Sequence, residues 1–267
     1  MHNNIDSLFD NLWSNYLSVT PLAKKVHDLI GATQTDEICN DHIALRTFNI
    51  EKVGLEKLAA HFKVLGYTEC GEYNFEGKKL YAKHFEHPNP MKPKVFISEL
   101  LVEKFSPEIQ KVIHDLVDQI DDEAITADNF LYSGTHWSID SETYKMLLAE
   151  SEYAAWTAAW GYRANHFTIN INYLTNFNDI KAVNQAIKDA GFVLNTSGGE
   201  IKGSPDVLLE QSSTLADNFN VKFSDIEMEI PSCFYEFAYR YNKPNGDVYT
   251  GFVAASADKI FESTNVR

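Results

Sequence analysis

The sequence predicts an α+β fold in which one strand–helix–strands unit occurs twice. A strand that carries His42 precedes an amphipathic helix ending at Gly66, and a strand that carries His166 precedes a helix ending at Gly191. These two spacings, 24 and 25 residues, are nearly equal. Short alternating runs follow each helix, as is typical of antiparallel strands. We therefore expect two βαβββ modules that contribute to one mixed sheet.

The chain is expected to begin with helices and then enter the first module. Apolar residues recur at helical spacing from Ile5 to Leu17, and a second short helix is expected from Pro21 to Ile30, with Gly31 ending it. The first module opens with the strand "CNDHIALRTF" (Cys39 to Phe48) and continues with a helix whose apolar stripe includes Leu55, Leu58, Phe62 and Leu65. Three antiparallel strands are expected at 67–75, 78–86 and 94–101.

A mainly helical insertion separates the two modules. One helix of the insertion has Ile109, Ile113 and Leu116 on its apolar side, and another has Tyr144 and Leu147. In the second module the helix carries Ile180, Val183 and Ile187, and strands are expected at 200–211, 222–230 and 233–241. All parts are assigned to a single domain, with N-terminal helices at 1–31, the first module at 38–102, the insertion at 103–163, and the second module with the C-terminal segment at 164–267.

Composition excludes several classes of protein. The 267 residues carry a net charge of −15 without a basic cluster, so we expect neither nucleic acid nor an anionic membrane as a partner. Three cysteines without a CxxC pair indicate neither a disulfide framework nor a zinc–thiolate knuckle. The N-terminus lacks the pattern of a signal peptide, and no apolar run is long enough to span a bilayer. We expect a cytoplasmic protein; the oligomeric state is not predicted.

The strand "CNDHIALRTF" is unusual because it presents polar groups on one side. Side chains alternate along a strand, so His42, Ala44 and Arg46 share a face opposite Ile43 and Leu45. In so acidic a chain an anionic ligand needs a local positive centre. The Arg46 guanidinium suits a carboxylate held through two hydrogen bonds. The alternative is a salt bridge between Arg46 and one of the 38 acidic residues.

His42 and His166 lead equivalent strands, so internal symmetry would bring both imidazoles to one centre. Taken singly, each histidine is better explained as a core residue that is hydrogen-bonded to the backbone. A third metal ligand is available in the apolar strand "SCFYEFAYRY", where burial of Glu236 without a partner would be costly. The alternative for Glu236 is an ion pair with Arg240 or a surface position, and Glu99 is a second candidate carboxylate.

Two histidines and one carboxylate leave coordination positions open on one side of a metal. This arrangement is used by non-haem Fe(II) enzymes that bind substrate and O₂ together. Zinc held by the same ligands would favour hydrolysis through an activated water. The ligand types do not decide between the two metals. His84 and His87 are interpreted as surface residues, and Ser256 near the C-terminus offers a hydroxyl that could close over a site.

The segments "DHIALRTF", "NHFTIN", "FYEFAYR" and "GFVAASADKIFEST" resemble the 2-oxoadipate dioxygenase/decarboxylase family, also called hydroxyglutarate synthase. The resemblance covers nearly the whole chain. The family is similar in architecture to the vicinal oxygen chelate superfamily, in which paired βαβββ modules form a cup, or half-barrel, around a metal.

The resemblance implies an Fe(II) enzyme of lysine catabolism. It would convert 2-oxoadipate and O₂ to 2-hydroxyglutarate and CO₂. By the family pattern, His42, His166 and Glu236 would bind the iron, Arg46 would bind a substrate carboxylate, and Ser256 or Ala255 would line the pocket. Two alternatives stay open. One is a hydrolase or lyase that acts on a small carboxylate with zinc or another divalent metal at the same ligands; the other is a non-catalytic binding module.

Overall fold

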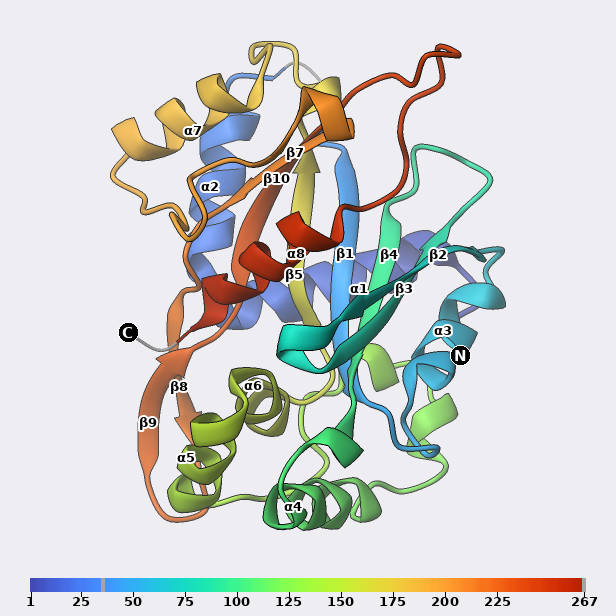
Figure 1. Cartoon of the computed structure of the whole chain (residues 1–267), viewed down its shortest axis with the longest axis vertical. Coiled ribbons are helices and arrows are strands. Elements are labelled where there is room, and N and C mark those ends of the chain that lie inside the picture. Colours follow the sequence, from blue (N-terminus) through green and yellow to red (C-terminus); the bar gives the residue numbers. More distant parts are fainter. Residues whose placement is uncertain (35–36, 266–267) are drawn as a thin grey trace.

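An eight-stranded mixed sheet forms the centre of the molecule (Figure 1). The computed structural model describes residues 1–34 and 37–265. The strand order is β2-β3-β4-β1-β5-β10-β7-β6. The sheet curls into a half-barrel, so the predicted α+β fold with a cup-like mixed sheet is confirmed. The strands are β1 (Asn40–Phe48), β2 (Thr68–Phe75), β3 (Leu80–Glu86), β4 (Lys94–Leu100), β5 (Ala164–Asn170), β6 (Lys202–Ser204), β7 (Leu209–Ser213) and β10 (Phe234–Arg240).

The sheet consists of two halves with the same arrangement. In the first half β1 pairs parallel with β4, β4 antiparallel with β3, and β3 antiparallel with β2. In the second half β5, β10, β7 and β6 pair in the same way. The halves meet where β1 pairs antiparallel with β5. An approximate two-fold axis therefore passes between β1 and β5, as the repeated pattern in the sequence predicts.

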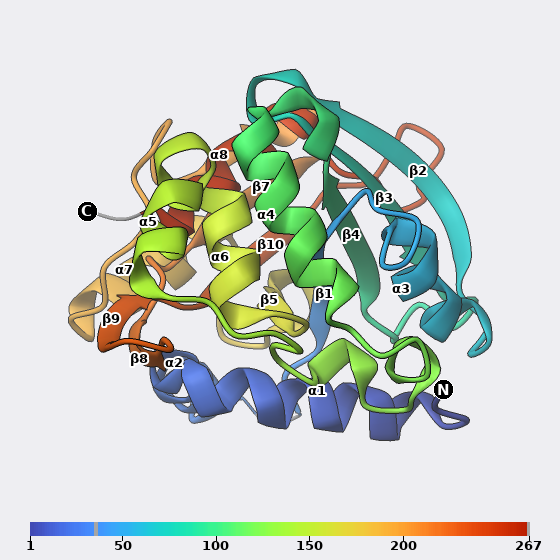
Figure 2. The same cartoon turned by 90° about the horizontal axis from the view of Figure 1, so that it is seen from below.

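Helices cover both faces of the sheet. Figure 2 shows α1 (Ile5–Val19) on one side and α4 (Pro107–Asp118) and α6 (Glu152–Trp160) on the other. Trp13 and Tyr16 of α1 pack against Phe167 and Tyr235, which lie on the convex face of the sheet. The remaining α-helices are α2 (Pro21–Gly31), α3 (Leu55–Lys63), α5 (Ser141–Glu150), α7 (Ile180–Asp189) and α8 (Ala254–Ile260). None of the helices within the described ranges has the length and apolar character that a bilayer span requires.

Helix α8 covers the concave side of the sheet. It contacts β2 at one edge of the sheet and both β6 and β7 at the other (Figure 1). The concave face is therefore enclosed by the insertion helices together with the C-terminal segment. Side chains that point to this face from β1, β5 and β10 are shielded from solvent.

Two strand predictions in the second module were wrong. The run at 200–211 is interrupted by a 3-10 turn, at which Leu208 has a left-handed backbone with φ +62°, and it forms β6 and β7. The run at 222–230 does not join the main sheet. Strands β8 (Asn218–Lys222) and β9 (Glu227–Pro231) form a separate hairpin, and the aromatic rings of Phe219 and Phe223 pack against the insertion helices. Alternation along a strand predicts one buried face, but it does not identify the partner strand.

Gly161 gives a test of how the insertion connects to β5. This residue ends α6 with φ +62°, and a Cβ there would lie 2.2 Å from the carbonyl oxygen of Gly134. We expect Gly161→Ala to lower the free energy of unfolding by about 3 kcal/mol or more, because the clash adds to the backbone strain. Gly191→Ala is the matched control: φ is +86° but no atom lies within 4 Å, so strain alone costs about 1 kcal/mol. Urea unfolding measures both variants, and equal losses would contradict the prediction.

Candidate metal centre

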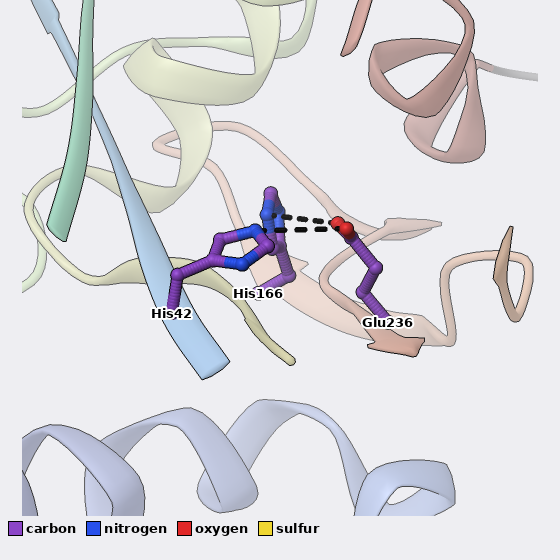
Figure 3. Close-up of side chains that lie close together, drawn as sticks. All are labelled: His42, His166 and Glu236. Carbon is purple, nitrogen blue, oxygen red and sulfur yellow. Dashed lines mark ion pairs between the residues drawn. The ribbon is translucent and has the colours of Figure 1, made fainter. Parts of the chain in front are cut away.

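His42, His166 and Glu236 come together on the concave face (Figure 3). They lie on the adjacent strands β1, β5 and β10. His42 Nε2 is 3.6 Å from Glu236 Oε1, and His166 Nε2 is 3.2 Å from Glu236 Oε2. Two ligand atoms that each bind one ion at about 2.0–2.2 Å stand roughly 3.0–3.6 Å apart. The three side chains thus have the spacing of ligands that share one metal ion.

A β-bulge precedes each histidine. In the pairing of β1 with β5, Asn40 and His42 oppose the consecutive residues Ile169 and Thr168, so Asp41 is an extra residue. On the other strand Asn165 is the extra residue, because Ala44 pairs with His166 and Leu45 with Ala164. Bulges redirect side chains at functional sites. Here they allow Asp41 and Asn165 to contact the histidines that follow them.

The bulge residues orient both imidazole rings. Asp41 Oδ1 lies 2.7 Å from His42 Nδ1, and Asn165 Oδ1 lies 3.0 Å from His166 Nδ1. If each Nδ1 carries the proton, Nε2 is left as the free base that faces Glu236. Metal-binding histidines commonly have such a partner on the second nitrogen. The sequence pairs "DH" and "NH" therefore encode equivalent supports for the two rings.

Arg240 connects Asp41 with the loop that precedes α8. Its Nε and Nη2 donate to the Asp41 carboxylate at 2.6 and 2.8 Å. Burial alone would raise the pKa of Asp41, but Arg240 and His42 outweigh it and hold that pKa well below its usual range. Nη1 of Arg240 donates to the carbonyl oxygens of Tyr249 and Gly251. The alternative ion pair of Arg240 with Glu236 is thus not formed, because Arg240 is engaged by Asp41.

The electrostatic environment favours a bound cation. Burial lowers the pKa of His42 and lowers that of His166 well below its usual value, so both rings are neutral bases. Burial raises the pKa of Glu236 to about 8. Gln211 Nε2 donates to Glu236 Oε1 at 2.6 Å, but Oε2 has no hydrogen-bond partner among the described residues. The 3.2 Å contact with His166 thus lacks hydrogen-bond geometry, and an unpaired, fully buried oxygen fits a metal ligand.

Aromatic side chains enclose this centre. The cavity has a volume of about 20 Å³, which is room for one water molecule. The Phe252 ring lies 4.8 Å from the His42 ring and almost perpendicular to it, and Phe252 N donates to Tyr73 Oη at 3.1 Å. The cavity is lined by His42, Phe96, His166, Gln211, Glu236, Phe252, Ala257, Ile260 and Phe261.

Arg46 is buried beside the cavity with an incomplete set of partners. Its guanidinium packs 4.9 Å from the Tyr153 ring and 4.8 Å from the Trp156 ring. Nη1 donates to Glu152 Oε1 at 3.2 Å and Nη2 to Thr264 Oγ1 at 3.0 Å. Nε has no hydrogen-bond partner within the described part of the chain. Arg46 thus forms the salt bridge considered as an alternative, yet it keeps one buried donor free.

The other candidate residues lie elsewhere. Glu99 faces the side of β4 opposite to the cavity, where its Oε2 accepts from Leu55 N at 2.8 Å. Glu99 is thus not the counterpart of Glu236 in the first module, because strand register gives that position to Phe96. Ser256 is buried near Gly203 and Ala255 is exposed, and neither is among the residues that line the cavity. The prediction of a surface position for His84 was wrong, because this side chain is buried.

Comparison with known proteins identifies the family. The family model described as 2-oxoadipate dioxygenase/decarboxylase matches residues 20–246. A chloroplastic 2-oxoadipate dioxygenase/decarboxylase of Arabidopsis thaliana is 38% identical over 97% of this chain and 76% of its own length. This chain belongs to the 2-oxoadipate dioxygenase/decarboxylase family. The resemblance inferred from the four sequence segments is therefore confirmed.

Solved structures of relatives agree with this family and with the fold. The hydroxyglutarate synthase of Oryza sativa, solved in complex with 2-oxoadipate, is 36% identical with a TM-score of 0.90, covering 99% of this chain and 94% of its own. A protein of Shewanella frigidimarina, assigned provisionally to the hydrolases, is 65% identical with a TM-score of 0.92. The match covers 96% of this chain and 100% of its own. A protein of Ralstonia eutropha assigned to the glyoxalase superfamily shares the fold. It is 22% identical with a TM-score of 0.73, and the match covers 92% of this chain and 85% of its own.

The sequence analysis did not predict the residues that contact His42, His166 and Glu236. Asp41 and Asn165 immediately precede the histidines, and this shared position was the available signal. Gln211 and Phe252 come from segments far from the histidines in the sequence. Their contacts depend on the pairing of β7 with β10 and on the path of the loop before α8, and neither is encoded in a local pattern.

The raised pKa of Glu236 predicts how the metal-free protein responds to pH. Because the folded-state pKa of about 8 lies above the usual value of 4.5, the folded state holds this proton more tightly than the unfolded state. The associated stability is present below about pH 4.5 and is lost as the pH rises to 8, which amounts to a few kcal/mol. Glu236→Gln removes this loss, so the metal-free variant should be more stable than the metal-free wild type at pH 8.

Urea unfolding at pH 5 and pH 8 measures this difference. Both proteins contain His42 and His166, so the comparison between them isolates Glu236. The variant should also lose metal binding, which elemental analysis measures. A variant less stable than the wild type at pH 8 would show that Glu236 is a structural ion-pair residue and not a strained metal ligand.

Proposed function

We propose that this protein is an Fe(II)-dependent dioxygenase that converts 2-oxoadipate, or a similar 2-oxo acid, and O₂ to 2-hydroxyglutarate and CO₂. Membership of the family supports the reaction type. The observation that carries the proposal for this chain is the convergence of His42, His166 and Glu236, with one Glu236 oxygen unpaired in a buried cavity. We further propose that the reaction belongs to lysine catabolism in the cytoplasm.

The donor set suits the proposed metal. Two neutral imidazoles and one carboxylate on one side of an ion leave positions for a chelating 2-oxo acid and for O₂. Iron held by these residues would supply the one- and two-electron chemistry that O₂ activation requires. The bond between the carboxylate carbon and the keto carbon breaks to release CO₂. One oxygen atom of O₂ joins the former keto carbon, which becomes the new carboxylate, and the other becomes the hydroxyl on the adjacent carbon. The atoms therefore balance without a second oxo acid.

The protein's own residues orient the reactants. Asp41 and Asn165 hold the two imidazoles so that each Nε2 faces the cavity. Arg46 would bind the distal carboxylate of the substrate through Nε and a neighbouring nitrogen, as a planar guanidinium does. Phe96, Phe252 and Phe261 exclude water from the reacting atoms.

Substrate binding requires the covering segment to move. The cavity of about 20 Å³ holds one water molecule, whereas a 2-oxo diacid is far larger. The cover consists of Phe252 and α8, so we propose that this segment opens for the substrate. Ser256 and Ala255 lie on α8, and their proposed contact with substrate would form when this helix shifts.

A metal-dependent hydrolase is the second candidate function. It is favoured by the hydrolase assignment of the 65%-identical Shewanella frigidimarina protein. Zinc at the same three ligands would activate a water molecule for attack on a small carboxylate substrate. The two candidates differ in metal and in the consumption of O₂, so they are separable by experiment.

The first test of function measures metal and O₂ together. Protein purified without oxygen should contain one iron per chain. Iron-loaded protein should then consume one O₂ and release one CO₂ for each 2-oxoadipate. Zinc-loaded protein should consume none, because zinc has no redox chemistry. If the iron-loaded protein consumes no O₂ with 2-oxoadipate or its shorter and longer homologues, the dioxygenase proposal is wrong; tight ligand binding without turnover would instead indicate a binding module.

The second test separates substrate binding by Arg46 from its structural ion pair. Arg46→Met should raise KM about 100-fold, because it leaves a substrate carboxylate buried without a partner, while iron content stays unchanged. Glu152→Gln is the matched control, because it breaks the same ion pair without removing the guanidinium. We expect its KM to change less than about threefold, in line with the small value of partly exposed ion pairs. Equal effects of both variants, or loss of iron from Arg46→Met, would show that Arg46 only supports the fold.

A further inference from the structure

We propose that Cys70, His84 and Glu86 form a second divalent-cation site, separate from the His42–His166–Glu236 centre. One ligand atom of each residue lies within 4.8 Å of the other two. Glu86 Oε1 and His84 Nε2 form a hydrogen bond of 3.0 Å, a separation that two ligands of one ion also have, so a bound cation would replace this hydrogen bond. The remaining distance to the sulfur is closed by rotation of an exposed cysteine side chain.

Strand register explains why these three side chains meet. On β3, His84 and Glu86 are two residues apart and share a face. On β2, Thr68 pairs with Glu86 and Gly71 pairs with His84. The register shift between Glu69 and Gly71 leaves Cys70 as an extra residue beside them. As at the two histidines of the main centre, a bulge provides the additional side chain.

The imidazole of His84 is prepared for a cation. Its Nδ1 is 2.9 Å from Tyr73 Oη, so the ring is held at one nitrogen and presents Nε2 toward Glu86. Gly71 gives the ring space, because a Cβ at that position would lie 3.0 Å from His84 Nδ1. His84 is 2% exposed, whereas Cys70 is on the surface. A cation would therefore arrive from solvent at the sulfur and be held by the buried ring.

The donor set selects the class of metal. Thiolate, imidazole and carboxylate together suit Zn²⁺ and chemically similar ions, whereas Mg²⁺ and Ca²⁺ prefer oxygen ligands alone. Two anionic ligands and one neutral ligand match a divalent charge. Among the described residues the hydrogen bonds of Cys70 Sγ are long, 3.5 Å to Thr68 O and 3.9 Å to Thr68 Oγ1. Little is therefore lost when the sulfur turns to a metal.

The cluster lies against the segment that covers the main centre. Tyr73, which holds the His84 ring, also accepts a hydrogen bond from Phe252 N at 3.1 Å. The His84 ring is 5.3 Å from the Phe252 ring. A cation that immobilises His84 would therefore hold Phe252 over the cavity. Occupation of the second site should slow access of substrate to the main centre.

Cobalt titration tests the site, because a thiolate ligand gives Co²⁺ a charge-transfer band in the near ultraviolet. His42, His166 and Glu236 include no thiolate, so this band reports only on the second site. In the wild type we expect the band at one equivalent of Co²⁺ beyond the equivalent that the main centre binds. In Glu236→Gln, whose main centre binds no metal, the band should still form. Cys70→Ser should abolish it and weaken Co²⁺ binding at this site about tenfold or more. Cys39→Ser is the matched control and should retain the band, since Cys39 lies outside this cluster and its thiol donates to the Asn40 carbonyl oxygen.

A missing band in the wild type, or a band that persists in Cys70→Ser, would overturn the site. The link to substrate access has its own readout. One equivalent of Zn²⁺ added to iron-loaded wild type should lower kcat/KM about fivefold or more, in the range of ordinary couplings between sites, and should leave Cys70→Ser nearly unaffected. Both proteins keep the main ligands, so displacement of iron by Zn²⁺ would affect them equally, and equal inhibition would overturn the link. The cobalt result is independent of whether the proposed dioxygenase activity is correct.

Discussion

The antiparallel pairing of β1 with β5 is the constraint on which the rest of the structure depends. This single pairing joins the two modules, places His42 and His166 on one face, and contains both bulges that precede them. A shift of one residue in register would turn every side chain of one strand to the opposite face. If β5 shifted, His166 would enter the apolar layer under α1, and Phe167 would face the cavity. Extensive packing of Trp13 and Tyr16 against Phe167 prevents such a shift.

The buried carboxylate of Glu236 illustrates how the module repeat is used asymmetrically. By register, Phe96 occupies the same position in the first module. Exact symmetry would bring two carboxylates to the centre and raise the cost of burying charge. Instead one module provides the anion and the other an aromatic wall. The repeated module thus places two equivalent imidazoles, His42 and His166, at the centre. The difference between the modules adds the Glu236 carboxylate on one side and the Phe96 ring on the other.

The parts of the structure that depend on local pattern could be predicted from the sequence. Alternation in "NDHIALRTF" placed His42 and Arg46 on one face, and the apolar context of "FYEFAYR" singled out Glu236. Prediction failed where pairing between distant segments decides the result. The bulges depend on the register of strands from different modules, the hairpin of β8 and β9 depends on packing against the insertion, and His84 is buried because Phe252 covers it. These are tertiary effects that override local propensity.

Arg240 joins two parts of the molecule that are far apart in the sequence. The same guanidinium holds the Asp41 carboxylate, which orients a histidine, and the carbonyl oxygens of Tyr249 and Gly251, which fix the loop bearing Phe252. The position of the loop over the cavity and the orientation of the His42 ring therefore both depend on Arg240. A homologue that acquires a longer or shorter loop must preserve this anchoring point or lose alignment at the centre. A movement of the cover that broke the bonds of Arg240 to the loop would therefore also disturb the carboxylate that orients the His42 ring.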